Sequence, residues 1–208
     1  MKKIDKSLIK TNLVIFGGSN KPTFYDALNK QLKYIGLHLD TEKFKIWYGG
    51  GNEGIMATVP TVFMKKGGFI GSVDWKKFVN QSSLAESVEN NFFHFEKQVE
   101  ETFHERQKKL IEKGDLYLCL PGGVGTLSEV LDVLVQNDTQ GTKKIIVMFS
   151  FQGFFRDIEL FLRNKEQEQF IKKELLDSIF FIDNADEILN FLNNDAFHRR
   201  SLRRAKNR

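Results

Sequence analysis

Short apolar runs alternate with longer amphipathic stretches along this chain. The apolar runs are rich in β-branched and aromatic residues and do not alternate with polar ones, which is typical of strands buried on both faces. Six such runs predict strands, at residues 12–16, 43–48, 68–73, 116–120, 144–149 and 179–182. Apolar residues at helical spacing predict helices at about residues 22–37, 53–66, 92–113, 126–137, 154–163, 167–177 and 185–193.

This alternation predicts the fold class. Strands that are separated by helices form a parallel sheet with helices on both faces. We therefore expect an α/β fold, a Rossmann-like doubly wound parallel sheet, as one domain over residues 1–196. The polar stretch 74–91 fits no regular element, and we favour a surface loop there over a flap above a site.

The charge of the chain is concentrated at its end. The net charge is +4, but residues 197–208 carry six basic and no acidic side chains, and the rest carries 25 basic and 27 acidic ones. We favour a solvated basic tail over one that contacts nucleic acid. The remaining sequence shows no basic stripe interleaved with aromatic residues, so no nucleic-acid groove is predicted.

A lone cysteine, Cys119, lies inside the apolar run "LYLCL". It forms no internal disulfide, which favours a reducing, cytoplasmic setting, and we expect a buried, unreactive thiol. The apolar runs are too short to span a bilayer, so no membrane association is predicted. The histidines at 38, 94, 104 and 198 show no metal-ligand spacing, so we predict neither a metal nor a cofactor.

Nine of the sixteen glycines fall in three clusters, "FGGSN" (16–20), "YGGGNEG" (48–54) and "PGGVGT" (121–126). Each cluster follows a predicted strand and opens a predicted helix, so all three are expected at the carboxyl edge of the sheet. Glycine turns at helix N-termini bind anions, most often phosphate. Tight turns without a ligand are the alternative, but three at one edge favour a nucleotide-like ligand.

Neither standard nucleotide fingerprint is complete in these turns. No turn ends in the Lys-Ser/Thr of a Walker A loop. Residues 49–54 contain G-x-G-x-x-G, but they follow the second predicted strand. No acidic residue about twenty positions later ends a predicted strand, as the ribose contact of a dinucleotide site requires.

Arg106 is predicted on the apolar face of the helix over 92–113. That face consists of Phe92, Phe95, Val99, Phe103 and Leu110. A core-facing arginine needs an anion to offset its desolvation. The anion is a phosphate or carboxylate of a ligand, or a structural partner within the protein. His104, two residues earlier, is expected on the surface.

Glu129 admits two interpretations. "TLSE" (126–129) matches a capping box, with Thr126 as N-cap and Glu129 turned back to its backbone N–H. Alternatively Glu129 faces a ligand above the glycine turn, where a carboxylate beside a ribose can activate water or stabilise a growing positive charge. The sequence leaves both orientations open.

Taken together, these segments resemble the Lonely Guy (LOG) family. "PGGVGTLSE" is similar to its P-G-G-x-G-T-x-x-E signature, "FHERQKK" to its M-x-E-R-K helix, "YGGGNEGIM" to its G-G-G-x-x-G-x-M turn and "FGGSN" to its first-strand C-G-S-S turn. Order and spacing are kept over roughly residues 12–150. The chain departs from these motifs at four positions, which bear on base specificity: Phe16, Ala57, Phe103 and Gln107.

The resemblance implies a Rossmann-like homodimer that hydrolyses the N-glycosidic bond of a nucleoside 5′-monophosphate. The implied substrates are AMP or N6-modified AMP, such as a cytokinin riboside monophosphate, and the products are free base and ribose 5-phosphate. It implies Arg106 and Glu129 as the catalytic pair. The implied substrate-binding residues are Gly17, Gly18, Ser19, Gly50, Gly51, Gly54, Glu105, Gly122, Gly123, Gly125 and Thr126.

Two further interpretations accompany the family resemblance. Family members have carried a lysine decarboxylase label, but nothing in this sequence suggests a lysine that binds pyridoxal phosphate. A protein that binds a nucleotide without cleaving it, as a sensor or carrier, remains the alternative to an enzyme. The same glycine turns would serve either function.

Overall fold

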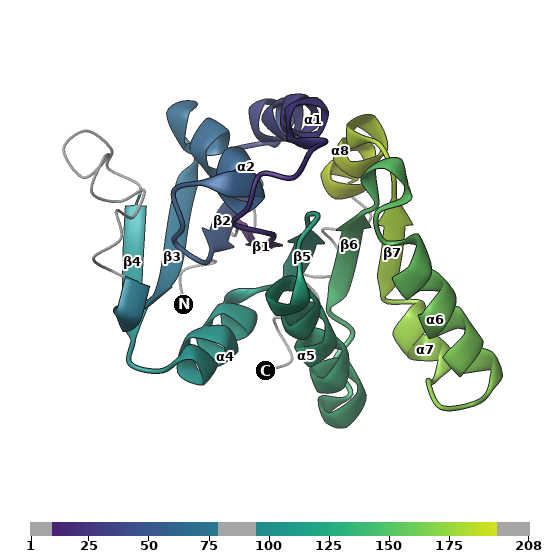
Figure 1. The fold of residues 1–208 in the computed structure, drawn as a ribbon. Helices are drawn as coiled ribbons and strands as arrows, with labels where there is room; N and C mark the ends of the chain where they lie inside the picture. Colours follow the sequence, from purple (N-terminus) through teal and green to yellow (C-terminus); the bar gives the residue numbers. More distant parts are fainter. Residues whose placement is uncertain (1–9, 79–94, 195–208) are drawn as a thin grey trace, which may run out of the picture.

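The computed structural model describes residues 10–78 and 95–194, which form a parallel sheet with helices on both faces (Figure 1). The strands are β1 (Thr11–Phe16), β2 (Phe44–Tyr48), β3 (Phe69–Trp75), β4 (Phe95–Glu100), β5 (Leu116–Cys119), β6 (Ile145–Phe149) and β7 (Ile179–Ile182). The helices are α1 (Tyr25–His38), α2 (Gly54–Lys65), α4 (Phe103–Lys113), α5 (Val124–Gln140), α6 (Arg156–Gln167), α7 (Lys173–Leu176) and α8 (Ala185–Asn193).

The strand order is β4-β3-β2-β1-β5-β6-β7, and all the pairings are parallel. The chain winds outward from β1 to β4, returns to β5 beside β1, and winds outward again to β7. This confirms the predicted doubly wound α/β fold. The order reverses between β1 and β5, which is where such folds bind ligands, and β2 lies next to β1. The turns after β1, β2 and β5 are therefore neighbours.

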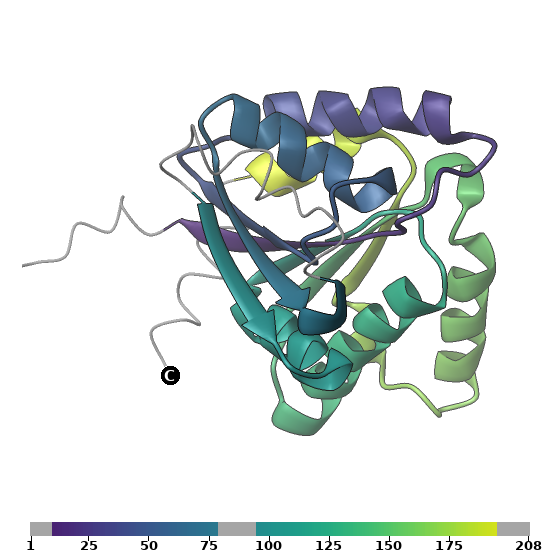
Figure 2. The ribbon, with the colours of Figure 1, turned by 60° about the vertical axis from the view of Figure 1, so that its left-hand side comes forward.

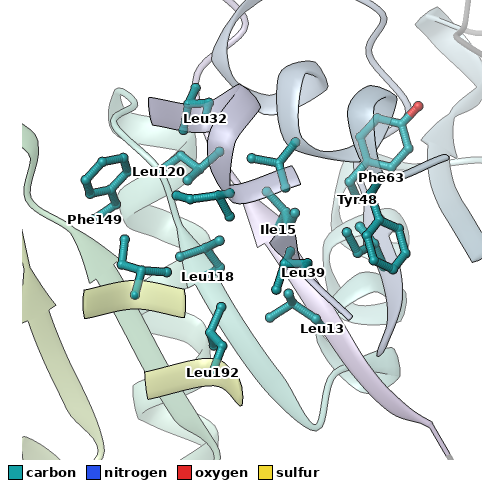
Figure 3. Packing of buried hydrophobic residues seen from close by; sticks show 14 of the residues in the cluster. Leu13, Ile15, Leu32, Leu39, Tyr48, Phe63, Leu118, Leu120, Phe149 and Leu192 are labelled. Atoms are coloured by element: carbon teal, nitrogen blue, oxygen red, sulfur yellow. The ribbon is translucent and has the colours of Figure 1, made fainter. Parts of the chain in front are cut away.

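Two hydrophobic clusters, one on each face of the sheet, make up the core. Helices α1, α2 and α8 pack on one face, and α4, α5 and α6 on the other (Figures 1 and 2). Alternate residues of a strand point to opposite faces, so in β1 Leu13 and Ile15 join the first cluster and Val14 and Phe16 the second. Figure 3 shows the first cluster, in which Leu13 and Leu118 of the strands lie among helix side chains such as Leu32 and Leu192. Burial on both faces explains why the strands lack polar alternation.

The predicted helix over 92–113 is wrong in its first part. Residues 95–100 form β4, which pairs with β3, and α4 begins only at Phe103. Phe95 and Val99 therefore do not share a helix face with Arg106, and Phe92 lies outside the described residues. Residues four apart lie on one side of a strand as well as of a helix, so this spacing did not separate the two structures.

Part of the predicted loop 74–91 is also regular structure. Asp74 and Trp75 are the last residues of β3, and a short 3-10 turn follows at Lys76–Phe78. The rest of that stretch and the basic tail 197–208 lie outside the described residues. Within the described ranges, no helix has the length and apolar character needed to cross a membrane.

Candidate functional site

The three glycine turns are joined by backbone hydrogen bonds at the carboxyl edge of the sheet. The N–H of Gly18, after β1, donates to the carbonyl of Pro121, after β5, at 3.0 Å. The carbonyl of Gly18 accepts from the N–H of Met56, in the first turn of α2, at 3.1 Å. The turn after β1 thus lies between the other two, as the strand order requires.

The N-terminus of α2 is occupied by the protein itself. Gly54 has φ +75°, and a Cβ there would lie 2.1 Å from the carbonyl oxygen of Ser19. Together with the bond from Met56 to Gly18, this contact places the turn after β1 where a pyrophosphate would approach a dinucleotide fingerprint. In the G-x-G-x-x-G of residues 49–54, the turn after β1 thus packs against the start of the helix, where a dinucleotide fingerprint holds its pyrophosphate.

The expectation that no acidic residue ends a strand after this turn is wrong. Asp74 lies about twenty residues beyond Gly54 and within β3, which runs to Trp75 rather than to residue 73. The strand extends further because Asp74 and Trp75 pair with Val99 and Glu100 of β4, a strand that the sequence pattern concealed.

The N-terminus of α5 has open space beside its first amides. Gly123 is its N-cap and Val124 its first residue. The first helical bond runs from the N–H of Leu127 to the carbonyl of Gly123 at 3.1 Å, so the three amides before Leu127 lie ahead of the helical bonding pattern. Apart from the neighbouring backbone, no atom of the described residues lies within 4 Å of a Cβ built at Gly123 or Gly125. This turn leaves space for a ligand above helix N–H groups and the positive dipole end.

The capping-box interpretation of Thr126 and Glu129 is wrong. Because α5 starts at Val124, Thr126 lies inside its first turn, and its buried hydroxyl packs 2.2 Å from where a Cβ of Gly122 would be. The capping box forms instead at α4: Thr102 Oγ1 accepts from the N–H of Glu105 at 3.2 Å, and Glu105 Oε2 accepts from the N–H of Thr102 at 3.0 Å. Glu105 is exposed and engaged in this cap.

Glu129 lies on the second turn of α5 and forms an ion pair with Arg106 of α4. Arg106 Nη1 donates to Glu129 Oε1 at 2.8 Å, with only 12% and 9% of the two side chains exposed. Arg106 Nε donates to the carbonyl of Val73, in β3, at 3.2 Å. A Cβ on Gly49 would lie 1.8 Å from Arg106 Nη2, so the glycine makes room for the guanidinium. The sequence prediction that Arg106 needs a buried anion is thus met by Glu129.

Two buried carboxyl groups have raised pKa values near Arg106. Burial raises the pKa of Glu129, and Asp132 adds to the rise, while Arg106 opposes it. Burial also raises the pKa of Asp74, against the opposing effects of a hydrogen bond from Ser72 and the charges of Lys97 and Arg106. Such carboxyl groups can exchange protons nearer to neutral pH than exposed ones.

Cys119 lies in β5 on the face that α5 covers, and it is fully buried. Burial, followed by the charge of Glu129, raises the pKa of its thiol well above the usual value. This confirms the expectation of a buried thiol. His104 is exposed, also as expected. In the described part of the chain, no group of three His, Cys, Asp or Glu residues could hold a metal ion.

The structure brings most of the predicted site residues to one edge of the sheet. Gly17, Gly18 and Ser19 lie in the turn after β1, and Gly50 and Gly51 lie in the turn after β2, with Gly54 as the first residue of α2. Gly122 and Gly123 lie in the turn after β5, and Gly125 and Thr126 lie in the first turn of α5. Glu105, in its cap, is the exception.

Gln107 and Asp74 are two residues whose place the sequence did not indicate. Gln107 is buried, and its Nε2 donates to Ser128 Oγ at 3.2 Å and also to Asp132, so it ties α4 to α5. The one signal for Asp74 in the sequence was its position about twenty residues after Gly54.

The fold and the site define a Rossmann-like α/β protein whose glycine turns meet at the switch point of the sheet. The family model described as "Possible lysine decarboxylase" matches residues 56–192. The chain belongs to this family, the Lonely Guy family that its motifs resemble.

The curated relatives carry the name of an enzyme. A probable cytokinin riboside 5′-monophosphate phosphoribohydrolase of Oryza sativa subsp. japonica is 27% identical over 90% of this chain and 85% of its own length. Cytokinin riboside 5′-monophosphate phosphoribohydrolases of Arabidopsis thaliana and Mycobacterium marinum are each 25% identical, over 90% and 74% of this chain and 82% and 80% of their own lengths.

Solved structures share the fold at lower identity. The molybdenum cofactor carrier protein of Chlamydomonas reinhardtii superposes with a TM-score of 0.62 at 14% identity, over 93% of this chain and 99% of that one. The molybdenum cofactor binding protein of Rippkaea orientalis gives 0.63 at 17%, over 89% and 97%. At these identities the likeness establishes the fold.

Proposed function

We propose that this protein hydrolyses the N-glycosidic bond of a nucleoside 5′-monophosphate to free base and ribose 5-phosphate. The observation that carries the proposal is the buried ion pair of Arg106 and Glu129 at 2.8 Å, next to the open N-terminus of α5. Family membership and the activity named for the curated relatives support it. AMP and N6-modified AMP, such as a cytokinin riboside monophosphate, are the proposed substrates.

The phosphate binds on the turn of residues 121–126. Gly123 and Gly125 leave space above the first amides of α5, and an anion there gains both hydrogen bonds and a favourable helix dipole. The turn after β1, which Gly18 joins to Pro121, forms the neighbouring wall. The phosphate therefore fixes the ribose within reach of Glu129, one turn further along the helix.

Glu129 acts on the sugar. Its carboxylate accepts a proton from water as the water attacks C1′, and it stabilises the positive charge that develops on the ribose. Arg106 lowers the pKa of this carboxyl group against the effect of its burial and orients it through a direct hydrogen bond. Arg106 also lies where its guanidinium can contact the phosphoribosyl group, because Gly49 has no side chain in the way.

Base release tests the proposal. The purified protein is incubated with AMP, the other nucleoside monophosphates and N6-isopentenyl AMP, and free base is separated by chromatography. Glu129→Gln should reduce the rate at least ~100-fold. Asp138→Asn is the matched control, since it also replaces a carboxylate by an amide on α5, but at an exposed position paired with Lys172. It should retain wild-type activity.

The alternative is a protein that binds a nucleotide without cleaving it. Nucleotide binding without base release by the wild type, for every nucleotide tested, would establish that alternative and refute the hydrolase. Equal activity of Glu129→Gln and wild type would refute the role of Glu129 while leaving the reaction in place.

The proposed enzyme is a cytoplasmic homodimer. Leu131 and Val135 are exposed and four residues apart on α5, so they form an apolar stripe suited to a second copy. Light scattering of the purified protein should give twice the chain mass. A monomeric mass at micromolar concentration would refute the dimer.

A further inference from the structure

The proposed reaction leaves one proton unassigned. When the bond between C1′ and the base breaks, the base must gain a proton to leave as a neutral molecule, and Glu129 is occupied with the water. In the described residues, His104 is exposed on α4 and Cys119 is wholly buried beneath α5. Asp74 is a carboxyl group that none of the steps above uses.

Asp74 lies at the carboxyl edge of the sheet, against the glycine turn after β2. It is 6% exposed, and Ser72 Oγ donates to its Oδ2 at 2.6 Å. Its Oδ1 would lie 1.9 Å from a Cβ on Gly50, whose φ is +81°. Any side chain at Gly50 would displace the carboxyl group, so the glycine is what lets Asp74 reach this edge.

The proposed phosphate site is the turn after β5, and Asp74 of β3 lies on the far side of the Arg106–Glu129 pair from this turn. The phosphate turn follows β5, and β3 is three strand spacings away, or about 14 Å. Arg106 spans the interval, because its guanidinium contacts Glu129 of α5 and Val73 of β3. The proposed function puts the phosphate on α5 and the glycosidic bond at Glu129, and Asp74 then lies on the side of Glu129 away from the phosphate, where we place the base.

The surroundings of Asp74 raise the pKa of its carboxyl group above the usual value. Burial raises its pKa, whereas the hydrogen bond from Ser72 and the charges of Lys97 on β4 and Arg106 on α4 lower it. Tyr48 of β2 pairs in register with Ser72, and its hydroxyl is buried without a hydrogen-bond partner among the described residues. Arg106 donates a hydrogen bond directly to Glu129, whereas it acts on Asp74 through its charge. The carboxylate forms of Glu129 and Asp74 are therefore stabilised in different ways.

We infer that Asp74 is the general acid that protonates the leaving base, an assignment that rests on the proposed hydrolase function. As the C1′–N bond breaks, its electron pair stays with the base, and the Asp74 proton moves to a ring nitrogen. The hydroxide part of water bonds to C1′, and its proton goes to Glu129. Proton return from Glu129 through solvent restores Asp74, so one nucleotide and one water give one base and one ribose 5-phosphate.

Dependence on the leaving group tests this role. Asp74→Asn should lower the rate of base release from AMP at least ~100-fold. With 4-nitrophenyl β-ribofuranoside 5-phosphate, whose leaving group departs as a stable anion without a proton, the same variant should keep its rate to within a few-fold. Equal loss on both substrates, or no loss on AMP, would overturn the inference.

The pH profile of kcat gives a second test, because a purely structural role of Asp74 would leave this profile unchanged in a Ser72 variant. Ser72→Ala removes the hydrogen bond that stabilises the Asp74 carboxylate, so the pKa of Asp74 should rise. The alkaline limb of kcat for AMP should then move to higher pH by about half a unit or more. An unmoved limb would contradict the assignment.

These outcomes separate the inference from the proposed function. If the wild type releases neither adenine nor 4-nitrophenol, the hydrolase is refuted and Asp74 has no base to protonate. If the wild type releases adenine and Asp74→Asn does so equally well, only the assignment of Asp74 fails.

Discussion

Removing the guanidinium of Arg106 should leave the buried carboxylate of Glu129 without a partner for its charge. Arg106→Met keeps much of the aliphatic stem, so little packing is lost, but Glu129 loses its partner. Both side chains of the pair are roughly nine-tenths buried, and the N–O distance is 2.8 Å. Breaking a buried pair from one side costs about 3–5 kcal/mol because the other charge stays desolvated. We expect a loss of that size at pH 8, measured by urea unfolding.

The loss should depend on pH in a defined direction. Without Arg106, burial and the charge of Asp132 both raise the pKa of Glu129, so its pKa in the folded state rises further above the unfolded value of about 4.3. The native state then holds the proton more tightly than the unfolded state, so the free energy of unfolding falls as pH rises through this window. Arg106→Met should accordingly be closer to wild type at pH 5 than at pH 8.

A double variant isolates the cause. Arg106→Met with Glu129→Gln removes both charges, so it should recover most of the stability and lose the pH dependence. A loss below about 1 kcal/mol at pH 8, or the same loss at pH 5, would show that Glu129 is not desolvated as the structure places it.

Three further predictions concern the surroundings of the site. Gly50→Ala combines the strain of φ +81° with the contact to Asp74. Gly67→Ala, at φ +90°, adds strain alone, because apart from its chain neighbours no described atom lies within 4 Å of the added Cβ. Gly67→Ala should cost about 1–2 kcal/mol and Gly50→Ala clearly more, and equal losses in thermal unfolding would contradict the contact. Glu105→Ala should cost about 1 kcal/mol through the cap of α4, and an unchanged melting temperature would argue against that cap. Cys119 should not react with a thiol reagent in native protein, and rapid labelling would refute its burial.

Much of the fold could be predicted from local sequence because the parallel sheet buries its strands on both faces. The six predicted strands are all present, and the glycine turns lie at one edge as expected. β4 was missed because it is an edge strand with charged residues, and its place depends on pairing with β3, some twenty-five residues earlier. No local pattern records such a pairing.

The T-x-x-E pattern shows most clearly what sequence determines and what tertiary structure decides. It occurs at Thr102–Glu105, inside the helix that the sequence predicted over 92–113, and at Thr126–Glu129, where the sequence matched a capping box. The sequence by itself determined only that a carboxylate follows each threonine by three residues. The tertiary structure decided that Glu105 caps α4 while Glu129, on a helix that begins at Val124, meets Arg106. The physical reason is that a buried charge is stabilised by whichever opposite charge the packing of two helices brings within contact distance.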